Sequence, residues 1–223
     1  MPRPRVPAGI DTLLLDLDGT LLDLEYDNRF WFDVVPAAYA ALHGMDAAAA
    51  RIALAPRFRA IERTLPWYSI DYWSRELALD IAAMKRETAG GVRWLAGARE
   101  FLVAQRAAGL RLVLATNAHP VTLAIKDEAV GIAPYFDAML SSHQFGAPKE
   151  DPRFWQGLFA AEPVDPARTL FIDDSLVVLA AARAAGIAHL LAVARPDSTR
   201  PAREMPGFDI IETIADLVPA AGL

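Results

Sequence analysis

From residue 96 onward, short apolar runs alternate with longer segments in which apolar residues recur at helical spacing. The short runs predict buried strands, and the longer segments predict amphipathic helices. The predicted strands cover residues 11–16, 111–115, 138–141, 169–172, 189–194 and 209–211. The predicted helices cover residues 96–108, 120–130, 152–161, 175–185 and 213–217. This alternation indicates an α/β fold with a parallel sheet and helices on both faces.

Residues 22–90 have a different pattern, rich in alanine, arginine and aromatic residues with helical spacing throughout. Pro36 and Pro56 are expected to kink or divide two of the helices in this segment. Gly90-Gly91 at its end offers a hinge back to the main body. The expected helices lie near residues 27–43, 46–63, 71–78 and 79–88.

The chain is therefore expected to contain an α/β core domain, residues 1–21 and 91–223, with a small helical cap domain inserted at residues 22–90. The insertion separates Asp16 from Thr116 by 100 positions, far more than one crossover helix needs. Residues 1–10 are polar and proline-rich, and we expect them to be a lead-in without regular structure.

Polar residues follow three of the predicted strands. Asp16 and Asp18 end the first, Thr116-Asn117 ends the second, and Asp173-Asp174 ends a later one; Lys149 lies in the loop between the last two. Ligands of open parallel sheets bind beyond the carboxyl ends of the strands, so these residues are expected to converge.

Each of these motifs also has a structural interpretation. Asp18-Gly19 between apolar residues is a hairpin signal. Thr116-Asn117 and Asp173-Asp174 are residues that often cap helices. Lys149 alone is typical of a solvated loop, and we expect Lys85, in the run Met84-Lys85-Arg86, to be solvated.

Composition excludes several classes of function. The 223 residues carry a net charge of −6, which argues against a nucleic-acid-binding surface. There are no cysteines, so disulfides, thiolate catalysis and cysteine-ligated metals are excluded. No apolar run is long enough to span a membrane, and the N-terminus lacks the apolar stretch of a signal peptide, so a cytoplasmic protein is expected. The oligomeric state stays open between monomer and homodimer.

In their order and spacing, the motifs resemble those of the haloacid dehalogenase (HAD) superfamily of hydrolases. The resemblance is carried by Asp16-Leu17-Asp18-Gly19-Thr20, Thr116-Asn117, Lys149 and Asp173-Asp174. It implies a Rossmannoid parallel sheet of five strands in which the Asp16 strand is central and the Thr116 and Asp173 strands flank it. Residues 20–31, 67–74, 116–120, 145–151 and 170–175 resemble, more narrowly, the bacterial GMP/IMP nucleotidase branch.

The resemblance implies phosphate-ester hydrolysis in two displacements through an aspartyl-phosphate. Asp16 would be the nucleophile and Asp18 the general acid and base. Lys149, Thr116 and Asn117 would hold the phosphoryl oxygens.

Four aspartates facing a dianionic phosphate also need a cation, because like charges about 4 Å apart repel by roughly 4 kcal/mol at an effective dielectric of 20. Mg²⁺ suits such an all-oxygen site. By resemblance, Asp16 and Asp174 would be direct ligands and Asp18 would contribute its backbone carbonyl. Asp173 would bind directly or through water.

The cap would close over a small-molecule phosphate ester, a purine nucleotide by resemblance, and exclude water. Candidate substrate contacts are Trp31, Tyr68, Asp71, Tyr72 and His119. The aromatic candidates have an alternative role in the core of the cap itself, and His119 has one as a surface residue.

Two other functions stay open at this stage. A sugar-phosphate phosphatase or phosphomutase of the same superfamily shares the core chemistry. A non-catalytic binding protein is possible because fold alone does not imply function. The presence of Asp18, which the dehalogenases lack, favours phosphoryl chemistry.

Overall fold

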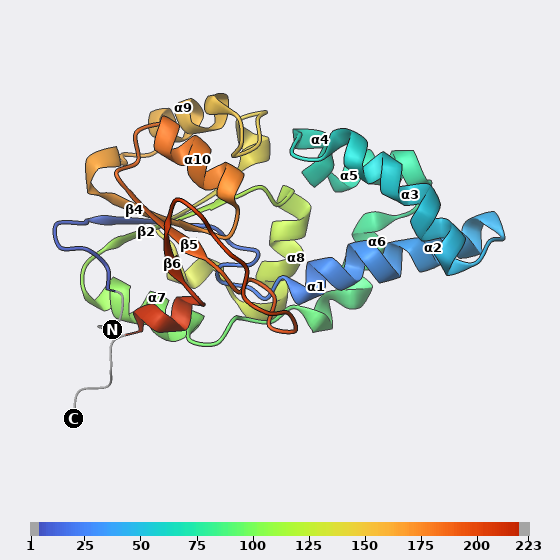
Figure 1. Cartoon of the computed structure of the whole chain (residues 1–223), viewed down its shortest axis with the longest axis horizontal. Coiled ribbons are helices and arrows are strands. Elements are labelled where there is room, and N and C mark those ends of the chain that lie inside the picture. The colour runs from blue at the N-terminus through green and yellow to red at the C-terminus, as the bar shows by residue number, and fades with distance from the viewer. Residues whose placement is uncertain (1–4, 219–223) are drawn as a thin grey trace.

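The computed structural model of the protein describes residues 5–218, so residues 1–4 of the expected lead-in lie outside it. A sheet of six parallel strands forms the centre, in the order β3-β2-β1-β4-β5-β6 (Figure 1). The strands are β1 (Thr12–Leu15), β2 (Arg111–Thr116), β3 (Ala138–Ser141), β4 (Thr169–Asp173), β5 (His189–Val193) and β6 (Asp209–Ile211). The predicted α/β fold is confirmed.

Strand β1 lies in the middle of the sheet, between β2 and β4. Leu14 pairs with Val113 on one side and with Phe171 on the other, both in parallel. The hairpin interpretation of Asp18-Gly19 is therefore wrong, because β1 pairs with distant strands and not with the segment that follows it. The five strands implied by the resemblance are joined by the short edge strand β6.

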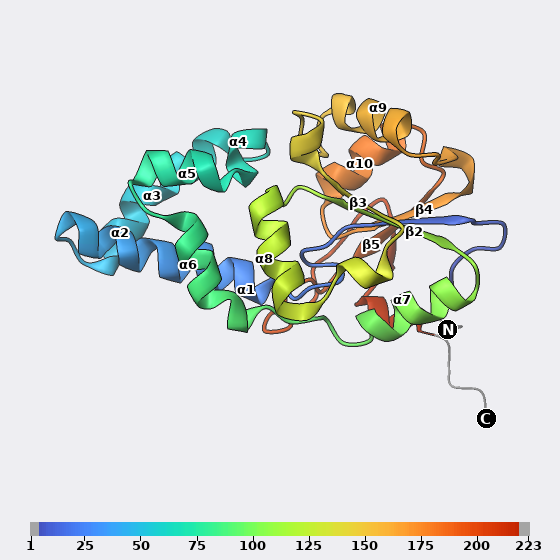
Figure 2. The ribbon, with the colours of Figure 1, turned by 180° about the vertical axis from the view of Figure 1, so that it is seen from behind.

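Both faces of the sheet are buried by helices. Successive side chains of a strand point to opposite faces, so each strand contributes to both sides. Leu13 and Leu15 pack in one hydrophobic cluster, whereas Leu14 packs in the other. Helix α7 (Ala98–Ala107) covers the first face, and α9 (Pro152–Ala161) and α10 (Leu176–Ala184) cover the second. Helix α8 (Pro120–Val130) lies between the sheet and the helices that precede α7 in the sequence (Figure 2).

Between β1 and α7 in sequence, six α-helices form a separate helical unit with its own hydrophobic cluster, at the right of Figure 1. They are α1 (Glu25–Arg29), α2 (Val35–His43), α3 (Ala47–Ile61), α4 (Leu65–Tyr68), α5 (Ile70–Leu77) and α6 (Ile81–Thr88). The predicted helices are present, and α4 is an additional short one.

The two prolines act differently. Pro36 follows a π-helical segment, Phe30–Val34, that joins α1 to α2. Proline denies a hydrogen bond to the carbonyl four residues earlier, and the freed Phe32 carbonyl accepts one from Arg51 Nε at 3.0 Å. Pro56, in contrast, lies inside an α3 that is not divided.

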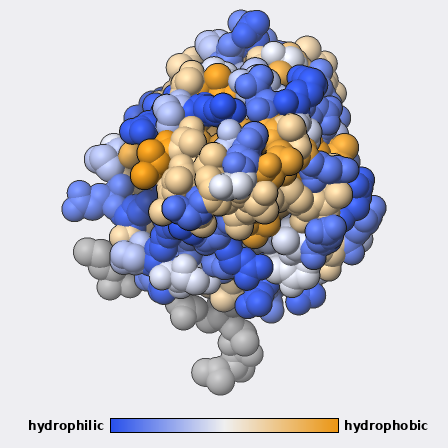
Figure 3. Space-filling model, turned by 90° about the vertical axis from the view of Figure 1, so that its right-hand side faces the viewer, coloured by the Kyte–Doolittle hydropathy of each residue, from blue (hydrophilic) through white to orange (hydrophobic). Residues whose placement is uncertain are grey.

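The helical unit is built around aromatic rings. The Trp73 ring lies 5.0 Å from that of Phe58, 5.9 Å from that of Trp67 and 6.0 Å from that of Trp31, measured between centroids. Figure 3 looks onto this end of the molecule and shows hydrophobic residues among hydrophilic ones. The exposed large hydrophobic residues of the unit are Phe32, Leu42, Met45 and Ile52. Within residues 5–218, no helix combines the length and apolar character needed to cross a bilayer.

Candidate active site

Three carboxyl groups meet at the carboxyl edge of the sheet. Asp16 follows β1 directly, Asp173 ends β4, and Asp174 comes next. Each offers one oxygen, and the three oxygens lie within 4.8 Å of one another. Asp16 and Asp173 are buried. The convergence expected from the strand ends is therefore present, and the three residues form an oxygen-donor cluster that could hold a metal ion.

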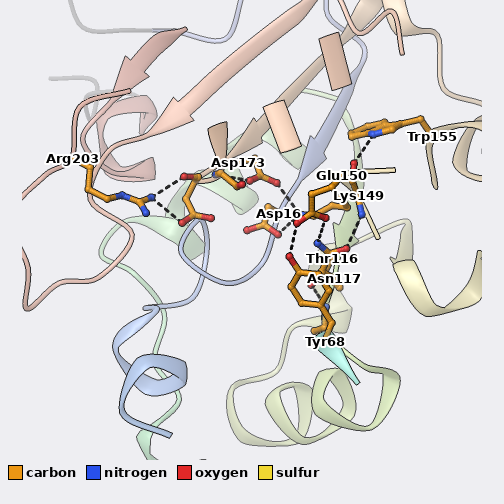
Figure 4. A network of polar contacts seen from close by, with 12 residues as sticks. Asp16, Tyr68, Thr116, Asn117, Lys149, Glu150, Trp155, Asp173 and Arg203 are labelled. Carbon is orange, nitrogen blue, oxygen red and sulfur yellow. Dashed lines mark hydrogen bonds and ion pairs between the residues drawn. The ribbon is translucent and has the colours of Figure 1, made fainter. Parts of the chain in front are cut away.

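Lys149 lies inside this cluster and not in solvent. Its Nζ donates to Asp16 Oδ1 at 2.5 Å and to Asp173 Oδ2 at 2.7 Å, and the residue is only 2% exposed (Figure 4). The Lys149 carbonyl accepts a hydrogen bond from Trp155 Nε1 at 2.8 Å. The solvated-loop interpretation of Lys149 is wrong, because helix α9 and both carboxylates enclose the side chain.

Asn117, directly after β2, connects the end of that strand to the Lys149 loop. The Asn117 side chain accepts from the Lys149 amide at 2.9 Å and donates to Glu150 Oε2 at 3.0 Å. Thr116 is buried, and its hydroxyl accepts from the Ala118 amide. Neither residue caps α8, whose N-cap side chain is His119. The two Asn117 contacts hold the Lys149 loop at the end of β2.

The acidic cluster is short of positive charge. Burial raises the pKa of Asp16 to about 7, although the Lys149 ammonium opposes the shift. Burial and the neighbouring carboxylates raise the pKa of Asp173 and of Asp174 to about 6 each. Among the described residues, the only cation besides Lys149 that pairs with these three aspartates is Arg203. Its guanidinium donates to Asp174 Oδ2 at 3.0 Å. A further cation would favour their ionised forms.

Asp18 lies in the turn that follows Asp16. Gly19, at φ +94°, makes this turn possible, since a Cβ there would come within 2.9 Å of the Asp174 carboxyl carbon. Asp18 Oδ1 accepts from Lys126 Nζ at 2.6 Å. The pKa of Asp18 is raised overall, because the effect of burial exceeds the opposing effect of the Lys126 ammonium.

A cavity of about 290 Å³ opens between this site and the helical unit. That volume is near the lower end for small-molecule sites, about 300–1,000 Å³. The core contributes the acidic cluster, Lys149, Lys126, Asn117 and His119, whereas the helical unit contributes aromatic walls together with Asp27, Asn28 and Lys85. Those walls are Trp31, Phe32, Trp67, Tyr68 and Trp73.

Three of the five candidate substrate contacts line this cavity, namely Trp31, Tyr68 and His119. The Tyr68 hydroxyl donates to Glu150 Oε1 at 2.5 Å. Tyr72 is not among the lining residues and packs edge-on against Trp73. Asp71 is also absent from the lining; its carboxylate is 67% exposed and lies 3.6 Å from His119 Nε2.

Sequence reasoning missed several polar residues around the cavity. Lys126 pairs with Asp18, Glu150 links Tyr68 to Asn117, and the expected solvated Lys85 is in fact 1% exposed. One signal was available for the lysines, because the chain has only three among 22 basic residues. All three of them are buried in this part of the molecule.

Comparison with known proteins gives consistent matches. Residues 10–186 match the family model of haloacid dehalogenase-like hydrolases. GMP/IMP nucleotidase YrfG of Escherichia coli (strain K12) is 44% identical over 189 residues, 85% of each chain. Phosphoglycolate phosphatase of Agrobacterium fabrum is 28% identical and covers 98% of this chain and 93% of its own. The crystal structure of a HAD phosphatase from Thermococcus onnurineus has a TM-score of 0.75 at 18% identity, covering 92% of this chain and 94% of its own.

Proposed function

Since the chain belongs to the haloacid dehalogenase-like hydrolase family and is a phosphoric monoester hydrolase, we propose that it is a Mg²⁺-dependent 5′-nucleotidase acting through a phosphorylated Asp16. The observation that carries the proposal is the position of the Lys149 ammonium. It lies between Asp16 and Asp173, on the floor of a cavity with aromatic walls. A buried cation beside a buried carboxylate suits attack on an anionic phosphoryl group.

In the first displacement, an Asp16 carboxylate oxygen attacks phosphorus. A new oxygen–phosphorus bond forms on Asp16 while the bond to the ester oxygen breaks. Asp18 gives its proton to the departing oxygen, which leaves as the free alcohol. Lys149, Thr116 and the Asn117 amide hold the phosphoryl oxygens and stabilise the charge that develops on them.

In the second displacement, water attacks the phosphorus held on Asp16. The water gives a proton to Asp18, the bond to Asp16 breaks, and inorganic phosphate is released. Asp16 returns as a carboxylate and Asp18 returns with its proton, so both residues are ready for another cycle.

The acidic cluster fits a Mg²⁺ ion, because Mg²⁺ prefers oxygen ligands and one or two carboxylates together with substrate phosphate. Asp16 and Asp174 would hold it with the Asp18 carbonyl, and Asp173 would bind directly or through water. The ion would supply the positive charge that three carboxylates and a phosphate dianion require.

We propose purine nucleoside monophosphates as substrates, on the basis of the relative named a GMP/IMP nucleotidase. The helical unit, residues 22–90, would act as a cap over the core of residues 1–21 and 91–223. Trp31 and Trp67 line the cavity, are only partly buried and would offer aromatic surface to a purine. Trp73 also borders the cavity but is 1% exposed and belongs to the core of the helical unit. Tyr68 and His119 would contact the rest of the nucleotide.

A phosphate-release screen tests the substrate class. The panel contains GMP, IMP, AMP, pyrimidine nucleotides, hexose phosphates and phosphoglycolate, compared by kcat/KM. GMP and IMP are expected to give the highest values. Activity confined to the sugar phosphates or phosphoglycolate would overturn the nucleotidase proposal and leave the phosphatase chemistry intact. Isomerisation of a hexose phosphate without phosphate release would indicate a mutase.

Removal of divalent metal is expected to lower kcat by about 10³-fold or more, since a bound ion supplies several kcal/mol of charge stabilisation. The measurement compares GMP hydrolysis in excess chelator with the same sample after Mg²⁺ is restored. Full recovery is the control for protein damage. Undiminished turnover in chelator would rule out the proposed role of the acidic cluster.

A further inference from the structure

Four side chains of alternating charge contact one another in a row that runs from Asp18 into the helical unit. Lys126 Nζ contacts Asp18 Oδ1 and Asp27 Oδ2, both at 2.6 Å. Asp27 uses its other oxygen, Oδ1, to contact Lys85 Nζ at 2.6 Å. Both lysines are 1% exposed. The pairing is continuous, and Asp18 Oδ1, Asp27 Oδ1 and Asp27 Oδ2 each have one ammonium partner.

The four residues come from different parts of the fold. Asp18 belongs to the turn after β1, and Lys126 belongs to α8 of the core. Asp27 lies on α1 and Lys85 on α6, the first and last helices of the helical unit. The Asp27–Lys126 pair therefore joins the helical unit to the core directly beside Asp18.

The far end of this row is held firmly. Lys85 Nζ lies 4.2 Å from the centroid of the Phe30 ring and 4.8 Å from that of the Tyr26 ring, in cation–π geometry. The Tyr26 hydroxyl donates to the Lys85 carbonyl at 3.2 Å. Lys85 is thus fixed by rings and by Asp27, and Asp27 in turn fixes Lys126.

Stability alone does not account for this arrangement. Burying an ion pair removes two charges from water, and a well-packed apolar replacement is often as stable or more so. Four charged side chains that line the cavity therefore call for a further role. Their contact with Asp18, the residue expected to move protons, supplies one.

We propose that Lys126, anchored by Asp27 and Lys85, is a positioning residue that directs the transferable proton of Asp18 to Oδ2. An ammonium group only donates hydrogen bonds, so Oδ1, which it contacts, must act as an acceptor. No residue within 5–218 donates to Oδ2. A proton carried by Asp18 therefore resides on Oδ2, and Lys126 prevents the carboxyl group from rotating away. This inference rests on the proposed function, in which Asp18 is the general acid.

The test compares two substrates that differ in their need for an acid. The leaving group of GMP is a nucleoside alkoxide, which needs a proton. The leaving group of p-nitrophenyl phosphate is a phenolate that is stable without one. The quantity measured is the ratio of kcat/KM for GMP to kcat/KM for p-nitrophenyl phosphate. This ratio reports the first displacement, and a general loss of folded protein does not change it.

Lys126→Met is expected to lower the ratio by about 10²-fold, the cost of misplacing a catalytic group. Asp27→Asn keeps Lys126 but removes its anchor, so a smaller fall is expected. The variant that combines Lys126→Met with Asp27→Asn is expected to have the same ratio as Lys126→Met alone, because Asp27 acts only through Lys126. Asp18→Asn, which removes the acid itself, should lower the ratio at least as far. Asp209→Asn, at an exposed position on β6, is the matched control.

The outcomes separate the inference from the proposed function. If Asp18→Asn lowers the ratio while Lys126→Met and Asp27→Asn reduce both substrates equally, the positioning role is wrong and the general acid stands. If Asp18→Asn leaves the ratio unchanged, the acid assignment itself fails. If Lys126→Met does not fold, Asp27→Asn decides alone, and an unaltered ratio in that variant overturns the inference.

Discussion

Asp16→Asn is expected to lower kcat/KM for GMP by about 10⁴-fold or more, because loss of a nucleophile removes the covalent route entirely. Asparagine has nearly the shape of aspartate, so the cavity and the Lys149–Asp173 pair should persist. The carboxylate oxygen that would form the bond to phosphorus is lost. The measurement is steady-state phosphate release with Mg²⁺ present.

The matched control is Asp209→Asn, an aspartate exposed on β6. It makes the same chemical change, so any loss specific to Asp16 reflects the site. Melting temperatures of both variants verify that they are folded. Phosphate release by Asp16→Asn at the rate of the unmodified protein would mean that the nucleophile is another residue, and the two-displacement scheme would fail.

Lys149→Met is expected to lower kcat/KM by about 10³-fold, the upper end for removing one donor to a developing oxyanion. The ammonium is buried and contacts two carboxylates, so its charge acts with little screening. Methionine fills a similar volume without charge. Steady-state kinetics with GMP at saturating Mg²⁺ gives the value.

A second readout separates charge from packing in this variant. Without Lys149, Asp16 and Asp173 face each other uncompensated, and we expect Mg²⁺ to raise the melting temperature more than it does in the unmodified protein. Arg99→Met removes one positive charge from the exposed face of α7 and serves as control. Retention of kcat/KM within about tenfold would contradict a direct role for Lys149 in stabilising the phosphoryl group.

The sheet and its acidic edge were predictable because local patterns decide them. An apolar run that stops at Asp16 or at Asp173 fixes both a strand and its polar end. Parallel pairing then brings those ends together. The Lys149 loop was predictable only through its motif, since nothing local distinguishes a buried lysine from a solvated one.

The row of charges behind Asp18 could not be predicted in this way. Lys126 and Lys85 lie on helices, where lysine is normally solvated and almost never fully buried. Their burial follows from the packing of α6 against α8 and from the pairing of both lysines with Asp27 of α1, contacts between residues far apart in the sequence. Glu150 and Tyr68 show the same limit, because 82 positions separate the two partners of that hydrogen bond.

The burial of every lysine also has a practical consequence. The outer surface carries its positive charge on arginine guanidinium groups, and Lys85, Lys126 and Lys149 are each at most 2% exposed. Reagents that acylate primary amines would therefore react little with these three lysine side chains while the fold is intact. Uptake of such a label at the three lysines would report the opening of the catalytic centre, residue by residue in a mass spectrum.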